Sequence, residues 1–497
     1  MIPNNPLVLV PIFAPLLGAA LCILFARYHR IQHGLGMTAS TLAWMASIMI
    51  LLLNWQDGLQ LYRLGGYAPP YGIVLAPDML SALFEVMATT VVWCGTLYIL
   101  GCRDKCISYP AFMPLFLCMS AGLNGAFYTG DIFTLFVFQE LMIISSVVLV
   151  AISDNRLGVE AAIKYLLISA MGSLFLLMGI AAIYATFGTL TLADIARILE
   201  SGERPLLAQA AAVTLMCSFL LKSAVFPFHF WQPDFHTAAP TPVHAVLSSV
   251  VVKVGVYGLF RLTTLLFIAE APLVRLLLLI LGVIGIFFGS LGALRTYDAK
   301  RMLAYSTFGQ IGFILLGIGW GTPLALVGAI VYAFNHAFIK SALLMITGAI
   351  ASRMPNKSAK LTDIGGAGQH LGTISVLYFI GGLALSGFPP FNGFISKVTI
   401  IQGGIEAQSW LVLGLAVGAG LITLLYMMRT WQHIFQRMPA EALILKPVGD
   451  SILAPALLVG LCVILGLFAM PLVEAATLAV SRLKDPQLYI RSVLGGV

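Results

Sequence analysis

The sequence predicts an all-α polytopic membrane protein that forms a single membrane domain over residues 1–497, and three observations indicate this fold class. Hydrophobic residues make up 60% of the chain and charged residues only 9%, whereas soluble globular domains carry about 25% charged residues. Apolar segments of about 20 residues, which cross roughly 30 Å of hydrocarbon as a helix, recur along the whole chain. The connections between them are mostly short, so we expect no separate soluble domain.

The apolar segments number about fourteen when they are judged by the length that a membrane-crossing helix needs. We expect transmembrane helices at residues 5–27, 35–53, 77–101, 109–129, 131–152, 161–187, 207–230, 241–267, 273–294, 301–320, 324–352, 372–401, 409–436 and 451–476. The first segment lacks the basic start and the small-residue cleavage site of a signal peptide, so we expect it to be retained as a helix.

The distribution of basic residues predicts the orientation. Of the 27 Lys and Arg residues, fourteen fall in odd-numbered connections, and eight fall in even-numbered connections, a nearby helix end and the C-terminal tail. Because cytoplasmic connections are enriched in Lys and Arg, we expect a multi-pass protein of the cell inner (plasma) membrane with both termini outside the cytoplasm. The net charge of +7 then reflects topology, and we expect no nucleic-acid partner.

Six charged residues lie inside the apolar segments. They are Glu140, Lys164, Lys222, Lys253, Lys340 and Lys397. Each costs roughly 2.5 to 3.5 kcal/mol at the bilayer centre on insertion scales, and such residues commonly mark ion pathways. Two other interpretations stay open: a static buried ion cluster, and side chains that reach the membrane surface, as Lys164 could do beside Glu160.

Two of the expected helices contain breaks. Pro227 lies five residues after Lys222 in the seventh helix, and Pro389 and Pro390 precede Lys397 in the twelfth. Proline removes a backbone donor and clashes with the preceding turn, so we expect both helices to be interrupted. The seventh and twelfth helices run in opposite directions, which predicts two inverted five-helix repeats at roughly 109–267 and 273–436, flanked by helices in 5–101 and 451–476.

Several motifs together carry a family resemblance. They are TGDIFTLFVFQE, LGVEAAIKYLLISAMGSLFLLMGIAAIYATFGTL, KSAVFPFHFWQPDFHTAAPTPVHAVLSSVVVKVGVYGLFR, AYSTFGQIGFILLGIG, NHAFIKSALLMITGAI and SGFPPFNGFISK. Over residues from about 5 to 475 the chain resembles the antiporter-like membrane subunits of Mrp-type cation/proton antiporters, respiratory complex I and membrane-bound hydrogenases, which implies a single antiporter-like membrane domain. Its length and the lysine at position 397 are most similar to the D subunits of Mrp antiporters.

The resemblance implies roles for individual residues. Glu140 resembles the family's paired acid and Lys222 its partner, since an opposite charge within about 4 to 6 Å keeps both groups ionised. Lys253 resembles the central proton carrier, because an apolar setting disfavours the charged form of a lysine and lets it release a proton. Lys397 resembles the carrier on the exit side. In this order the four residues would form a polar axis through the middle of the bilayer.

Histidines are expected to link these groups. His336 and Lys340 are four residues apart in the eleventh helix and therefore share a face. His244 lies nine residues before Lys253, about 13.5 Å along a helix, which suits a water-filled access path rather than contact. For His229 and His236, which flank Pro233, we favour a structural role.

Two residues depart from the family pattern. Glu85 stands about two turns into the third helix, where we expect an apolar residue. It could face a neighbouring subunit or stay near the surface with Asp78. Gln139 also replaces a bulky apolar residue beside Glu140, which indicates less dry surroundings for that acid.

We therefore expect the proton-translocating subunit of a multisubunit monovalent cation (Na⁺)/H⁺ antiporter, which works with other membrane subunits and without a cofactor. The alternative is the proton-pumping membrane subunit of a complex I-like NADH-quinone oxidoreductase or a membrane-bound hydrogenase. A non-conducting scaffold is a third possibility. The seven cysteines are scattered without metal-ligand spacing, and no nucleotide-binding or nucleophile motif is evident, so we expect a transporter subunit and not an enzyme.

Overall fold

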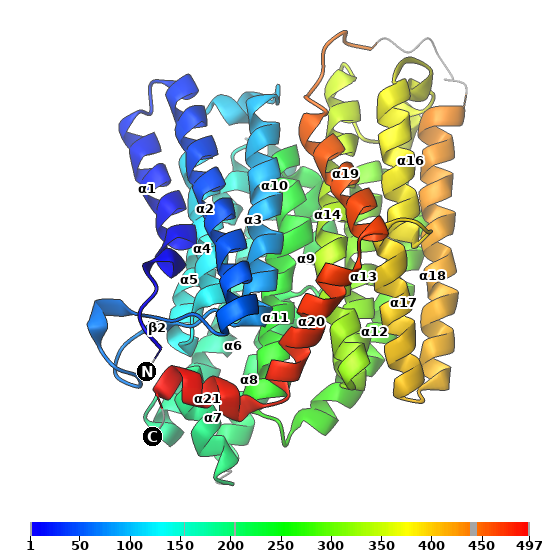
Figure 1. Cartoon of the computed structure of the whole chain (residues 1–497). Helices are drawn as coiled ribbons and strands as arrows, with labels where there is room; N and C mark the ends of the chain where they lie inside the picture. Colours follow the sequence, from blue (N-terminus) through cyan, green and yellow to red (C-terminus); the bar gives the residue numbers. More distant parts are fainter. Residues whose placement is uncertain (1, 154, 203–204, 438–444, 496–497) are drawn as a thin grey trace.

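The computed structural model describes residues 2–153, 155–202, 205–437 and 445–495. These residues form one bundle of roughly parallel helices, in which the two ends of the chain lie on the same side (Figure 1). The all-helical fold class predicted from composition is confirmed. A single two-stranded sheet interrupts the helices within the described residues, formed by β1 (Tyr62–Arg63) and β2 (Val74–Leu75).

Ten helices of the described residues are long and apolar enough to cross a membrane. They are Pro6–Leu24 (with α1, Val10–Leu24), α2 (His29–Asp57), α3 (Met79–Leu100), α5 (Ile132–Ala151), α6 (Arg156–Phe187), the continuous helix Thr241–Leu266, α12 (Ala271–Arg295), α13 (Ala299–Trp320), α14 (Pro323–Arg353) and Trp410–Gln436 (with α18, Trp410–Trp431). The continuous helix Thr241–Leu266 joins α10 (Thr241–Val246), a π-helical turn η4 (Leu247–Val251), α11 (Val252–Arg261) and a second π-helical turn η5 (Leu262–Leu266).

Three shorter apolar helices accompany them: α4 (Phe112–Tyr128), α8 (Leu206–Lys222) and α16 (Gly372–Ser386). The last expected span, residues 451–476, is wrong as a straight helix. The chain bends there by 77° between α19 (Leu453–Leu467) and α20 (Met470–Leu483). The helix α19 packs very closely at its end, because a Cβ on Gly466 would lie 2.0 Å from the carbonyl oxygen of Pro390.

The remaining helices are short or lie beside the breaks. They are α7 (Leu192–Glu200), α9 (Trp231–Ala238), α15 (Leu361–Ile364), α17 (Asn392–Glu406), α21 (Pro486–Leu494), the 3₁₀ turns η1 (Pro6–Leu9), η2 (Leu64–Gly66), η3 (Lys105–Ser108) and η6 (Ala367–His370), and the π-helical turn η7 (Gln432–Gln436).

Both expected breaks are present. The helix α8 ends at Lys222, and α9 begins only at Trp231, so the expected seventh helix over 207–230 is eight residues too long. The helix α16 ends at Ser386 and α17 begins at Asn392. Gly387 ends α16 with φ of 84°, and a Cβ there would lie 2.5 Å from Cδ of Lys397. Only glycine fits this left-handed position beside the lysine.

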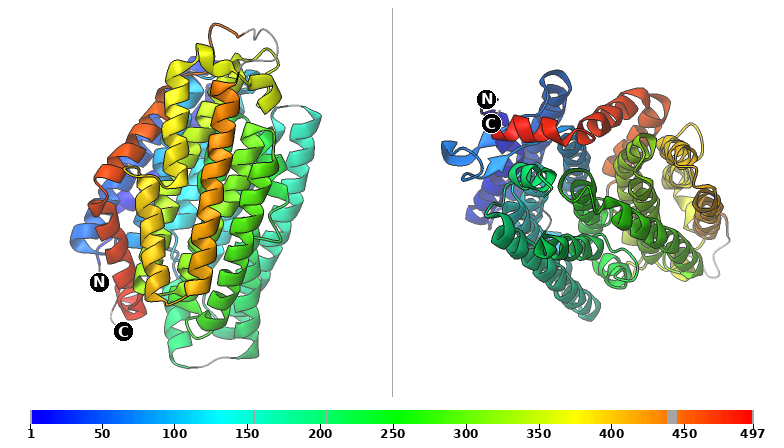
Figure 2. Two further views of the ribbon diagram at one scale, coloured as in Figure 1. Left: turned by 90° about the vertical axis from the view of Figure 1, so that its right-hand side faces the viewer. Right: turned by 90° about the horizontal axis from the view of Figure 1, so that it is seen from below.

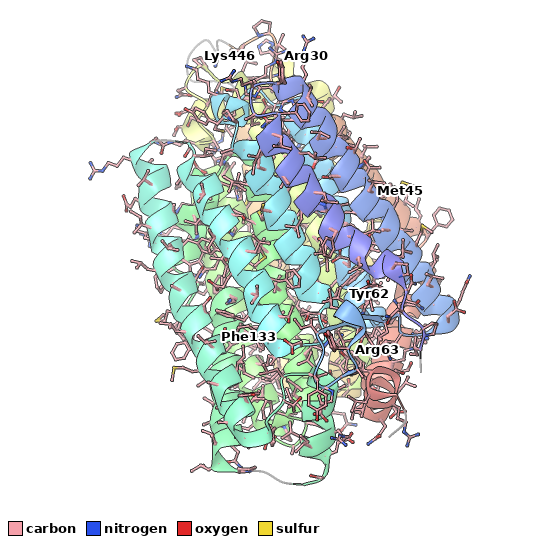
Figure 3. All side chains as sticks on the ribbon, turned by 90° about the vertical axis from the view of Figure 1, so that its left-hand side faces the viewer. Arg30, Met45, Tyr62, Arg63, Phe133 and Lys446 are labelled. Atoms are coloured by element: carbon pink, nitrogen blue, oxygen red, sulfur yellow. The ribbon has the colours of Figure 1, made fainter. Side chains whose placement is uncertain are left out.

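Central and outer helices differ in their burial. The most apolar stretches of Thr241–Leu266 and α14 are entirely buried, and those of α3 and α13 are largely buried. The outer helices α1, α2, α6, α12 and α18 surround them and keep apolar faces exposed, as the view from below shows (Figure 2). Met45 and Phe133 lie on this outer surface (Figure 3). Exposed apolar faces are what lipid or partner helices require.

Three basic residues mark the two ends of the bundle. Arg30 and Lys446, which belong to odd-numbered connections, lie at the same end, whereas Arg63 lies toward the opposite end (Figure 3). Arg30 belongs to the first turn of α2, and the chain termini lie at the opposite end of the bundle from that turn (Figure 1).

Candidate functional site

The first group of polar side chains lies where α5, α6 and α8 meet. Nζ of Lys222 donates to Oε1 of Gln139 at 2.6 Å and to Oγ of Ser173 at 3.3 Å. The Ser173 hydroxyl in turn donates to Oε1 of Glu140. The expected acid and lysine are thus connected through a serine, and they form no ion pair within 4 Å. Gln139, which departs from the family pattern, supplies the closest contact to the lysine.

The second group is centred on Lys253, which is fully buried. Its Nζ donates to the backbone carbonyl of Ser249 and lies 3.2 Å from Nδ1 of His336. The π-helical turn η4, which contains Ser249, ends two residues before the lysine; such turns are frequent at functional sites. The predicted link between the central lysine and His336 is therefore a direct contact.

Lys340 continues this group. It is fully buried one helical turn after His336, and its Nζ donates to Oγ of Ser306 at 2.7 Å and to the carbonyl of Leu303 at 3.2 Å. Oγ of Ser306 lies 2.7 Å from the hydroxyl of Tyr426 on α18. The chain Lys253, His336, Lys340, Ser306 and Tyr426 thus crosses from Thr241–Leu266 over α14 and α13 to α18.

The third group surrounds Lys397 on α17. Its Nζ donates to the carbonyl oxygen of Ser386 at 2.6 Å and lies 5.8 Å from the ring centroid of Phe313. These residues line a cavity of about 210 Å³ between α13, α16, α17 and α18. Ser306, Gln310 and Phe313 have i, i+4, i+7 spacing, so one face of α13 leads from Lys340 to Lys397 over about 10.5 Å.

Polar side chains occupy the interval along α13. The hydroxyl of Tyr332 donates to Oε1 of Gln310, and Nε2 of Gln310 donates to Oγ1 of Thr423 at 3.4 Å. The second and third groups are therefore separated by hydrogen-bonding side chains and not by apolar packing alone.

Fewer polar side chains lie between the first and second groups. The side chains of Lys222 and Lys253 share no hydrogen bond among the described residues. A cavity of about 10 Å³ is lined by Lys222, Val251 and Val254, which is near the lower limit for one water molecule. A proton passing here needs that water or a movement of the side chains.

His244 lies beside His236 of α9 and not beside Lys253. The two rings stack with centroids 5.2 Å apart and an interplanar angle of 15°. Both side chains are buried, and Nε2 of His244 and both ring nitrogens of His236 have no hydrogen-bond partner within the described residues. The sequence favoured a structural role for His236. Its pairing with His244 was missed because the two residues are on different helices.

Lys164 does not join these groups. Its side chain is exposed at 45% and forms ion pairs with Glu160 at 2.7 Å and with Asp234 at 3.3 Å. Asp234 also pairs with Arg301 at 3.1 Å. The surface interpretation of Lys164 accounts for these contacts, and exposed pairs of this kind contribute about 0 to 1 kcal/mol to stability.

Three hydroxyl residues of the site carried no sequence signal. Ser173, Ser306 and Tyr426 resemble the many small or aromatic residues of apolar helices, and only their contacts with Lys222 and Lys340 distinguish them. Within the described ranges, no group of three or more His, Cys, Asp or Glu residues is arranged to hold a metal ion.

Comparisons with known proteins cover the candidate site. A family model described as "NADH:quinone oxidoreductase/Mrp antiporter, TM" matches residues 129–423. The D subunit of the Na(+)/H(+) antiporter of Alkalihalophilus pseudofirmus is 32% identical over 494 residues, 99% of each protein. The N subunit of the NADH-quinone oxidoreductase of Desulforudis audaxviator is 30% identical over 93% of this chain and 95% of that protein.

A solved structure has the same fold. A chain in the structure of the Mrp complex from Dietzia sp. DQ12-45-1b matches with a TM-score of 0.89 at 26% identity and covers 99% of both chains. The family match spans every candidate site residue from Glu140 to Lys397. The chain belongs to the NADH:quinone oxidoreductase/Mrp antiporter family of membrane subunits.

Proposed function

We propose that this chain is the proton-translocating subunit of a multisubunit Na⁺/H⁺ antiporter, in which the three polar groups form one axis. The chain is a transporter component rather than an enzyme, and its partners are other membrane subunits. The observation that carries the proposal is the fully buried contact between Lys253 and His336, with Lys340 one turn away. Three titratable groups at this depth need a reason beyond folding.

The chemistry of the central group suits proton transfer. A protonated Lys253 can donate to Nδ1 of His336 at their separation of 3.2 Å. Two cationic groups side by side in a low-dielectric interior repel each other, so a proton arriving at one favours release from the next. Nζ of Lys340 donates hydrogen bonds to Ser306 and to a backbone carbonyl. These bonds allow it to hold an extra proton without an acidic partner.

The outer groups would couple this centre to charge movement. In the first group, the charge of Lys222 is balanced by Glu140 through the Ser173 hydroxyl, and protonation of Glu140 would weaken that balance. Lys397 would accept the proton at the far end, next to its cavity. The His236 and His244 pair would provide access to the centre from the end of the bundle that carries Arg301 and Lys164.

The finer topology belongs to the same proposal. If the three shorter apolar helices also cross the membrane, they would bring the ten long helices and the bent pair to the fourteen spans that we expect. The breaks after Lys222 and before Lys397 fall at corresponding places of the two expected inverted repeats. The position of Arg30 and Lys446 at one end supports a cytoplasmic location for that end and an outside location for both termini.

The alternative is a proton-pumping subunit of a redox-driven complex. The relative named as the N subunit of an NADH-quinone oxidoreductase favours it, because its identity is only slightly below that of the antiporter relative. The same polar axis would serve both functions. Purification of the complex separates them: a flavin or iron-sulfur protein in the complex would establish the alternative.

The axis is tested with the full complex in proteoliposomes, by following Na⁺-driven proton movement with a pH-sensitive dye. We expect Lys253→Ala to lower the initial rate at least tenfold while the other subunits still co-purify. Lys164→Ala is the matched control, since this lysine lies on the surface, and should keep the wild-type rate. Wild-type transport by assembled Lys253→Ala complexes would refute the axis.

A further inference from the structure

One buried acid lies outside the three polar groups. Glu85 of α3 is fully buried, and neither of its carboxyl oxygens has a hydrogen-bond partner among the residues that the structure describes. No described cation lies within ion-pair distance of it. An ionised carboxylate without partners costs several kcal/mol in a protein interior, so the group requires a proton or a bound cation.

Glu85 belongs to a polar stripe on α3. Asp78, Ser81, Glu85, Thr89 and Thr96 are spaced by three, four, four and seven residues, which places them along one face of the helix. Oγ1 of Thr89 lies 2.7 Å from Oγ of Ser47 on α2, and Oγ1 of Thr96 lies 2.9 Å from Oγ of Ser40. The stripe therefore runs through the interior of the bundle and not along its surface.

The stripe ends in a hydrogen-bonded cluster. Oγ of Ser81 lies 2.9 Å from the hydroxyl of Tyr257 and accepts from Nη2 of Arg261 at 2.9 Å. Arg261 also pairs with both carboxylate oxygens of Asp78 at 2.7 Å. Ser81 is one helical turn, about 6 Å, from Glu85. Tyr257 and Arg261 follow Lys253 by one and two turns on the same helix.

The groups around Glu85 favour a proton over a metal ion. On α4, the buried Tyr128 interacts electrostatically with Glu85, and its hydroxyl has no partner among the described residues. From α11, Tyr257 and Arg261 face the adjacent turn, and Tyr489 of α21 lies against Arg261. On α14, His336 and Lys340 are engaged with Lys253 and Ser306. Hard cations require several oxygen ligands, whereas a proton requires only the carboxyl group.

We propose that Glu85 is a second proton-binding site of this chain, and that its proton exchanges through Ser81 and Tyr257 with the end of the bundle where Asp78 and Arg261 lie. This site goes beyond the proposed axis, which does not use α3. It gives the N-terminal flanking helices a titratable group of their own. Whether that group contributes to transport is separate from whether it binds the proton.

The test measures protonation directly and independently of transport. Infrared difference spectra between acid and alkaline buffers are recorded on the assembled complex in liposomes. We expect a carboxylic-acid carbonyl band that shifts in D₂O, disappears in Glu85→Gln, and persists in Glu140→Gln and Lys253→Ala. Failure of the axis proposal would leave this band unchanged, so the two proposals fail separately.

Other outcomes of the same experiment would overturn the site. A Glu85→Gln spectrum identical to that of the wild type would show that Glu85 binds no exchangeable proton. Loss of the band on addition of Na⁺ at constant pH would identify a cation site instead. If Glu85→Gln does not assemble, Glu85→Asp replaces it, and an unshifted band would refute the assignment.

The exchange route has its own measurement. After a rapid pH change, Ser81→Ala and Tyr257→Phe should each slow the appearance of the Glu85 band at least fivefold, because each removes a hydroxyl between Glu85 and Asp78. Thr96→Val, on the same stripe but at its other end, is the matched control. Equal rates in all three variants would refute the route.

Discussion

The two helix breaks differ in how they stabilise a lysine. At the first break, the half-buried Lys222 contacts Gln139 and Ser173 and is connected through that serine to Glu140. At the second break, the half-buried Lys397 contacts the Ser386 carbonyl and an aromatic ring. No acid lies within 4 Å of Lys397 among the described residues. Lys222 therefore has a counter-ion nearby, whereas Lys397 is stabilised by a backbone carbonyl and an aromatic ring.

Both lysines are nevertheless associated with the C-terminal end of a helix. Lys222 is itself the last residue of α8. Lys397 belongs to the helix after its break, but it reaches back to Ser386, the last residue of α16. The C-terminal end of a helix carries partial negative charge, which favours a nearby cation by about 0.3 to 1 kcal/mol, and by up to about 2 kcal/mol in partly buried geometries. Despite the opposite sequence order of lysine and proline, each lysine is therefore associated with a helix C-terminus, and the ammonium of Lys397 contacts a carbonyl there.

The largest expected difference between the two breaks comes from reversing the charge of each lysine. Lys222→Glu places a second carboxylate near Glu140 and should abolish Na⁺-driven proton movement, whereas Lys397→Glu, which meets no acid, should keep part of it. The measurement is the initial rate in proteoliposomes, normalised to the amount of assembled complex. A complete and equal loss in both variants would show that position 397 needs a lysine specifically and not just a titratable group.

A second prediction removes the acid of the first break. Glu140→Ala should lower the initial rate at least tenfold, because Lys222 loses the charge that balances it. The rate is followed as a function of Na⁺ concentration, with co-purification as the test of assembly. The second break offers no equivalent substitution, because no acid lies within 4 Å of Lys397 among the described residues. Transport at the wild-type rate would show that the Ser173 link is only structural.

The smallest predicted effect compares two serines. Ser173→Ala removes a hydroxyl that bridges Lys222 and Glu140, and loss of one such hydrogen bond costs about 1 kcal/mol, or roughly a fivefold lower rate. Ser386→Ala should leave the rate unchanged, because Lys397 uses the backbone carbonyl of Ser386, and the side chain bonds only to Gly382. A larger effect from Ser386→Ala than from Ser173→Ala would contradict this difference between the breaks.

The sequence predicted the elements with strong local signals. Composition and apolar length identified the helices, and Pro227, Pro389 and Pro390 identified the breaks, because proline acts within its own turn. The direct contact of Lys253 with His336 joins helices far apart in sequence, and the pairing of His236 with His244 depends on the angle between the consecutive helices α9 and α10. No spacing rule along one chain provides such contacts.

Two misjudged features have the same physical origin. Helix α8 stops at Lys222, eight residues early, and the last expected span bends by 77° between α19 and α20. Hydropathy reports only that residues are apolar, and both stretches remain mostly apolar beyond the point where the helix ends or bends. The departure at Gln139 was visible in the sequence, but its role as an acceptor for Lys222 required the neighbouring helix.

The close approach of Gly466 to Pro390 links the end of the chain mechanically to the second break. The backbone of α19 rests against the carbonyl of Pro390, in the turn that separates α16 from α17, so a side chain at position 466 would push the two segments apart. Beyond its bend, α20 leads to α21, which holds Tyr489 against Arg261. The segment from α19 to α21 therefore connects the break before Lys397 with the cluster of Arg261, Asp78 and Ser81 at the start of the helix that carries Glu85.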